Sequence, residues 1–147
     1  MTENSIVQTK PKRRKIFIII SVAAVVFSVP VIVNIPNFRG MLEARKVFEA
    51  YHNAIIAKDY AAAYNFLAPE TKANVSYEKF LVIEDGLGKR VGALVSYSTS
   101  EMNTRGDDDR LITTIRATLR FERGSLEFDY VLKKEQGVWF IYKFDEL

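Results

Sequence analysis

The hydrophobic period of this chain changes once, and the change strongly limits the folds open to it. Up to Gly88, apolar residues recur at helical spacing. Beyond it they alternate with polar residues at the spacing of strands. Helices followed by strands joined by short turns are typical of an α+β domain, in which helices cover one face of an antiparallel sheet. Four largely single-faced strands need such a cover.

The pattern predicts three helices and four strands. We expect helices over 41–59, over 60–68, and from Tyr77 to Gly86 or Gly88, with Asp59 and Ser76 as N-caps of the second and third. We expect strands over 89–105 with a bend at Gly92, then over 111–123, 126–135 and 138–147, with turns at 106–110, 124–125 and 136–137.

The last strand is apolar on both faces. Trp139 and Ile141 alternate with a second apolar set, Val138, Phe140, Tyr142 and Phe144. An uncovered apolar face indicates an interface. Two readings stay open: a second copy or an envelope protein docks on Phe140 and Tyr142, or the bend of the sheet covers this face internally.

A second feature precedes the domain. Residues 16–33 are 18 apolar or uncharged residues, about 27 Å as a helix, which is close to the roughly 30 Å hydrocarbon core of a bilayer. No small-x-small cleavage pattern follows, so the segment favours a retained anchor over a cleaved signal. We therefore divide the chain into a tail (1–15), a transmembrane helix (16–35) and a domain (41–147).

The charges support this division and indicate an orientation. Of 21 basic and 18 acidic residues, five basic and one acidic lie in the tail, so the rest carries a net charge of −1. A domain without a basic surplus is not typical of nucleic-acid binding. Basic residues before the apolar segment favour a cytoplasmic N-terminus, a single pass through the cell inner membrane, and a periplasmic or extracellular domain. The tail is expected to contact lipid headgroups.

Two stretches carry a family resemblance. They are "AKDYAAAYNFLAPETKANVSYEKFLVIEDGLGKRVG" (57–92) and "YVLKKEQGVWFIYKFDEL" (130–147). With the helix order, they resemble nuclear-transport-factor-2-like (SnoaL-like or cystatin-like) domains of small membrane-anchored bacterial proteins. The resemblance covers 41–147 and implies a cone-shaped domain of three helices on a curved four-stranded sheet. The fold has enzymatic members and binding or assembly members, so the resemblance does not assign an activity.

The sequence offers few candidates for chemistry. It has no cysteine and one histidine, His52, which we expect at the edge of the apolar face of its helix. One histidine cannot build a two-histidine metal site, and the acidic turn 106–110 lacks the alternating ligand spacing of a calcium loop. The strand pattern points Asp129 to solvent. We therefore expect no catalytic residue, metal or cofactor.

Tyrosines and the tryptophan are the candidates for lining a pocket inside the cone. Amphipathic rings in an apolar core place their polar atoms at its rim. The candidate ligand-binding residues are Tyr51, Tyr64, Tyr97, Tyr130 and Trp139. The sequence thus predicts a membrane-anchored binding or assembly module without catalysis. The alternative is a small-molecule enzyme or binder that uses the pocket.

The predicted topology can be tested with a reporter. An enzyme that is active only outside the cytoplasm, fused after Leu147, should be active, because the positive flank keeps the N-terminus inside. The same fusion on a chain that lacks residues 1–35 is the control and should be inactive. Activity of a cytoplasm-dependent reporter at the same site would reverse the orientation.

Overall fold

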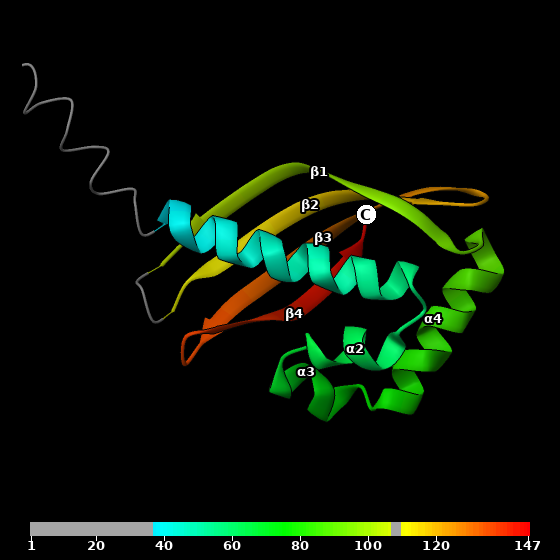
Figure 1. The fold of residues 1–147 in the computed structure, drawn as a ribbon, viewed down its shortest axis with the longest axis horizontal. Helices are drawn as coiled ribbons and strands as arrows, with labels where there is room; N and C mark the ends of the chain where they lie inside the picture. Colours follow the sequence, from blue (N-terminus) through cyan, green and yellow to red (C-terminus); the bar gives the residue numbers. More distant parts are fainter. Residues whose placement is uncertain (1–36, 107–109) are drawn as a thin grey trace, which may run out of the picture. The chain divides into compact units, whose positions relative to one another are not determined.

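The helices and strands occur in the order that the period predicts. The computed structural model describes residues 37–106 and 110–147 (Figure 1). A helix over residues 37–56 is followed by α2 (Tyr60–Asn65), α3 (Pro69–Asn74) and α4 (Tyr77–Val91). The strands are β1 (Leu94–Arg105), β2 (Ile112–Phe121), β3 (Gly124–Glu135) and β4 (Val138–Glu146). The α+β class is confirmed.

The four strands form one antiparallel sheet in the order β1-β2-β3-β4. The helix over 37–56 crosses one face of this sheet, as Figure 1 shows. β2 and β3 alternate as expected, and the core combines that helix with the inner face of the sheet. Its fully buried large side chains include Phe48, Leu67, Phe80, Leu111, Ile115, Leu132 and Ile141.

The two predicted N-caps are confirmed, whereas the first helix covers residues 37–56 and not 41–59. An Asp59 Oδ1 accepts a hydrogen bond from the Ala62 amide at 3.0 Å, and Ser76 Oγ accepts from the Lys79 amide at 3.3 Å. Both side chains satisfy amides that have no partner within the helix. The short α3 was not predicted, because Pro69 was read as a stop. Proline also suits the first position of a helix, and here it begins one.

The end of α4 differs from the prediction. The helix continues through Gly86 and Gly88 to Val91, so residues 89–91 are helical and do not belong to the first strand. Gly92 ends it with φ 85° and ψ −173°, a conformation that essentially only glycine adopts, and its amide donates to Gly88 O at 2.8 Å. The predicted ends, Gly86 and Gly88, lie within the helix, and Gly92, which was predicted to bend a strand, is the glycine that needs its lack of a side chain.

The turn between β2 and β3 also lies two residues earlier than predicted. Phe121 pairs with Gly124, so Glu122 and Arg123 form the turn. The Arg123 amide donates to Val91 O at 2.9 Å, and its guanidinium donates to Gly88 O at 3.0 Å. This turn therefore satisfies carbonyls at the end of α4, which explains its position. The predicted turn at Gln136 and Gly137 is confirmed.

A bulge in β4 corrects the expected face of Phe144. Ile141 pairs with Leu132 and Lys143 with Val131, so Tyr142 is an extra residue. The bulge reverses the alternation, and Phe144 lies on the inner face beside Tyr130, with 5.8 Å between ring centroids. Phe144 was predicted to share a face with Phe140 and Tyr142, and that prediction is wrong.

Three sequence predictions fall wholly or partly outside the described residues. The acidic turn includes residues 107–109, and the tail and apolar segment lie within 1–36. Among the helices of residues 37–106 and 110–147, none is long and apolar enough to span a bilayer.

The role of Gly92 can be tested against a glycine of the same helix. Gly92→Ala should lower the free energy of unfolding by about 1–3 kcal/mol, since an added Cβ lies 2.8 Å from Glu122 Cβ at a backbone angle that disfavours side chains. Gly88→Ala, where an added Cβ contacts nothing within 4 Å, should raise it by about 0.5–1 kcal/mol. Urea unfolding measures both. Equal effects would remove the special role of Gly92.

Candidate functional site

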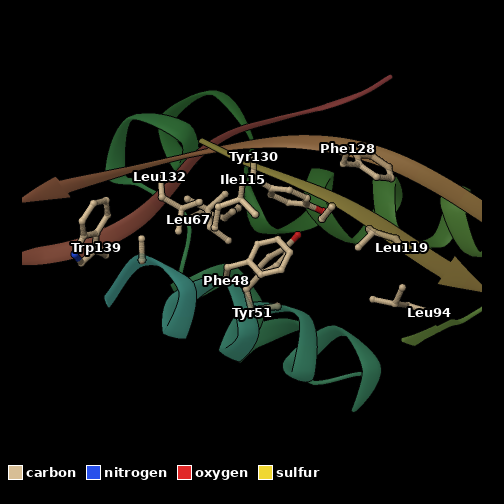
Figure 2. Close-up of a cluster of buried hydrophobic side chains, with 14 of the residues drawn as sticks. Phe48, Tyr51, Leu67, Leu94, Ile115, Leu119, Phe128, Tyr130, Leu132 and Trp139 are labelled. Carbon is tan, nitrogen blue, oxygen red and sulfur yellow. The ribbon is translucent and has the colours of Figure 1, made fainter. Parts of the chain in front are cut away.

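The core contains a cavity at the end of the sheet nearest α4. Its volume is about 450 Å³, within the range of small-molecule sites. The walls come from the first helix, α4 and the inner face of the sheet, and they are mostly apolar. The apolar lining residues are Ile55, Ile83, Leu87, Leu94, Leu119, Phe121, Phe128 and Phe144. Figure 2 shows several of these side chains between the helix and the sheet.

His52 lies in the wall of this cavity and is only 1% exposed. The expectation that it sits at the edge of the helix's apolar face is wrong. His52 lies within the apolar stripe of its helix. Its burial there is possible because a tyrosine from the sheet supplies a hydrogen-bond partner for the ring. His52 Nε2 lies 3.0 Å from Tyr130 Oη, and Nδ1 lies 2.8 Å from Phe48 O.

These two contacts fix where the protons are. A backbone carbonyl only accepts hydrogen bonds, so the proton of the neutral imidazole is on Nδ1. Nε2 is then an acceptor, and the Tyr130 hydroxyl donates to it. Burial lowers the pKa of His52 to about 4, so the ring is neutral at pH 7. The Tyr130 proton is therefore committed to the histidine.

Tyr51 presents a hydroxyl to the cavity from the same helix. Its side chain is 3% exposed and lines the cavity, and no hydrogen bond to its hydroxyl occurs within residues 37–106 and 110–147. Burial, with Glu84 as a second cause, raises the pKa of this phenol well above its usual value. A buried hydroxyl that faces open space can bond a ligand.

Glu84 is the functional candidate that the sequence reading missed. Its side chain enters the cavity wall from α4, and burial raises its pKa to about 7. The signal was present: Phe80, Glu84, Leu87 and Val91 follow one another at helical spacing, which places one carboxyl on a buried face. In the part of the chain that the structure describes, no side chain or amide donates to it.

An ion pair closes part of the cavity's rim. Arg90 of α4 bonds Glu146 at the end of β4, and both residues line the cavity. The two side chains are 53% and 38% exposed, so the pair belongs to the solvent boundary. Because of this ion pair, the Arg90 guanidinium already has a carboxylate partner.

The five predicted ligand-binding residues lie in four places. Tyr51 and Tyr130 line the cavity. Tyr97 lies beside it, with its ring 5.1 Å from His52 and its hydroxyl bonded to Asn53 at 3.1 Å. Tyr64 belongs to a separate cluster near Tyr77 and bonds Val75 O at 2.8 Å. Trp139 Nε1 donates to Glu43 at 3.1 Å at the other end of the sheet.

The outer face of the sheet holds the remaining candidates. Asp129 alternates away from the core as predicted and makes two hydrogen bonds to Arg116, at 2.9 and 3.0 Å. Tyr142 is held within the domain, where its hydroxyl bonds Glu70 at 2.9 Å. Phe140 is half-buried and lines a groove with Val47 and Phe66. The docking of a partner on Phe140 and Tyr142 stays a prediction.

The cavity suits reversible binding chemistry. Within mostly apolar walls, it offers one hydroxyl that has no partner among the described residues, one carboxyl, and one hydroxyl oxygen that can only accept. Among residues 37–106 and 110–147, no group of three or more histidine or acidic side chains could hold a metal ion.

The two titrating groups of the cavity wall, His52 and Glu84, predict opposite pH dependences. As pH falls from 6.5 to about 4, the unfolded chain protonates His52 before the folded chain does, so stability is lost, on the order of 3 kcal/mol. As pH rises from 4.5 to about 7, the unfolded chain ionises Glu84 first, so stability is lost in the other direction.

Two variants separate these terms. Relative to the native chain, Glu84→Gln should become more stable as pH rises from 4.5 to about 7. His52→Gln should become less stable, relative to the native chain, as pH rises from about 4 to 6.5. Urea unfolding across this pH range measures both differences. Native and variant curves that stay parallel would show that the two groups titrate normally.

Comparisons with known proteins add no assignment. No protein-family model matches the chain, and no curated protein matches it. The resemblance to nuclear-transport-factor-2-like domains therefore rests on the residues that carry it, and the function has to be argued from the cavity.

Proposed function

We propose that the chain is a membrane-anchored envelope protein whose exported domain binds a small, mostly apolar molecule in the cavity beside α4. One observation carries the proposal: the cavity of about 450 Å³ has mostly apolar walls, and it is lined by Tyr51, a residue only 3% exposed whose hydroxyl has no hydrogen-bond partner among the described residues. Concave apolar sites with a few convergent polar groups are the usual form of small-molecule sites.

The anchor and the cone-shaped fold belong to the same proposal. The 18 uncharged residues over 16–33 and their basic flank support a single-pass inner-membrane helix with a cytoplasmic N-terminus. Helices that cover one face of a four-stranded sheet, with a cavity between them, are consistent with a nuclear-transport-factor-2-like domain.

Binding is favoured over catalysis by the state of the cavity's polar groups. His52 uses one nitrogen on a carbonyl and the other on Tyr130, so it has no free position for a substrate proton. The second candidate, a pocket enzyme, has one observation in its favour. The pKa of Glu84, about 7, is near the value that suits a general base at neutral pH.

Occupation of the cavity can be tested with a neutral aromatic probe. The full-length chain, held in phosphatidylcholine nanodiscs, should bind 1-naphthalenemethanol in isothermal titration calorimetry. Leu87→Trp should abolish this binding, because the larger side chain at a half-buried lining position fills the site.

The control for this test is Val82→Trp. Val82 lies on the same helix, is 69% exposed and does not line the cavity. This variant should bind as the native chain does, and lipid partition of the probe is equal in both variants. Equal heats from the two variants would contradict the proposed function.

A further inference from the structure

The polar groups of the cavity differ in what they can offer a ligand. Three of them face its interior without a full set of partners: Tyr51 from the first helix, Glu84 from α4 and Tyr130 from β3. Each has a hydrogen-bonding capacity that follows from contacts already described. Together, these hydrogen-bonding capacities determine which polar group of an otherwise apolar ligand the cavity can bind.

Tyr130 can only accept. Its proton goes to His52 Nε2, because the imidazole proton is used on Phe48 O through Nδ1. The hydroxyl oxygen keeps lone pairs for a ligand. A ligand group that only accepts would meet this oxygen without a hydrogen between them.

Glu84 is a carboxyl group without a counter-charge. Arg90, the one basic residue that lines the cavity in the described part of the chain, is bonded to Glu146 at the rim. The raised pKa of Glu84 has burial as its cause, which is the behaviour of a carboxyl that lacks a cationic partner. A cationic ligand group would supply that partner.

The aromatic side chains in the cavity walls also favour a cationic ligand group. Tyr51, Phe121, Phe128, Tyr130 and Phe144 all contribute to the lining. The face of an aromatic ring carries partial negative charge and attracts a cation held near it. The same faces disfavour an anion, and so do Glu84 and the accepting oxygen of Tyr130.

We propose, on the basis of the ligand site proposed above, that the cavity selects an apolar molecule whose polar end is an ammonium group. Such a group donates to Glu84 and to Tyr130 Oη, while its apolar part occupies the space between Leu87, Leu94 and Leu119. Ligands that end in a carboxylate are rejected.

Three probes with one shared ring system test this selection. They are 1-naphthylmethylamine, 1-naphthalenemethanol and the carboxylate 1-naphthaleneacetate. Each is titrated at neutral pH into the full-length chain in phosphatidylcholine nanodiscs. The amine should bind about tenfold more tightly than the alcohol, because a charged hydrogen bond replaces a neutral one. The carboxylate should bind more weakly than the alcohol.

Glu84→Gln assigns the preference to one side chain. It should weaken amine binding about tenfold and leave alcohol binding nearly unchanged. Asp85→Asn is the matched control, since Asp85 is the next residue of α4, has a 63% exposed side chain and pairs with Lys89 at the surface. This control should keep the native preference.

The outcomes separate the two proposals. Alcohol or carboxylate binding as tight as amine binding, or an amine preference that survives Glu84→Gln, would overturn the ammonium selection and leave the ligand site standing. Binding of none of the three probes above the level of Leu87→Trp would overturn both.

Discussion

The hydrogen bond between His52 and Tyr130 joins the first helix to the sheet at the boundary between the packed core and the cavity. On one side of this contact, Phe48, Ile115 and Leu132 belong to the buried core. On the other side lies the cavity. A buried polar contact of this kind is retained only when both partners are satisfied, and here the Phe48 carbonyl completes the set. The hydrogen-bonding character of the Tyr130 hydroxyl in the cavity thus depends on one histidine.

The fold was largely predictable because its causes are local. Alternation defined the strands, and Asp59 and Ser76 carried their capping signals in their own side chains. The errors arose where a distant residue decided the local structure. Arg123 contacts the end of α4 and places the turn, and the bulge at Tyr142 appears only when β4 is paired with β3. The alternation of residues within one strand shows neither the contact of Arg123 nor the bulge at Tyr142.

The site was less predictable for the same reason. Four tyrosines and the tryptophan were predicted to line the pocket, but ring type does not say which end of the sheet a side chain reaches. Of the five, only Tyr51 and Tyr130 line the cavity. Glu84 was visible as a carboxyl on an apolar helix face, yet its meaning depends on the absence of a nearby cation among the described residues, which is a property of the folded chain. His52 was misplaced because its partner lies 78 residues away in sequence.

The edges of the sheet bear on how this chain behaves in a crowded compartment. Residues 66–68 run along the outer edge of β4, where Ala68 N donates to Ile141 O at 2.8 Å and Ile141 N donates to Phe66 O at 2.9 Å. The opposite edge, β1, carries two register irregularities and many exposed polar residues. Covered and irregular edges both discourage strand addition and aggregation. Open-ended growth of the sheet by addition of further strands is thereby disfavoured, which leaves side-chain surfaces as the places where another chain could bind reversibly.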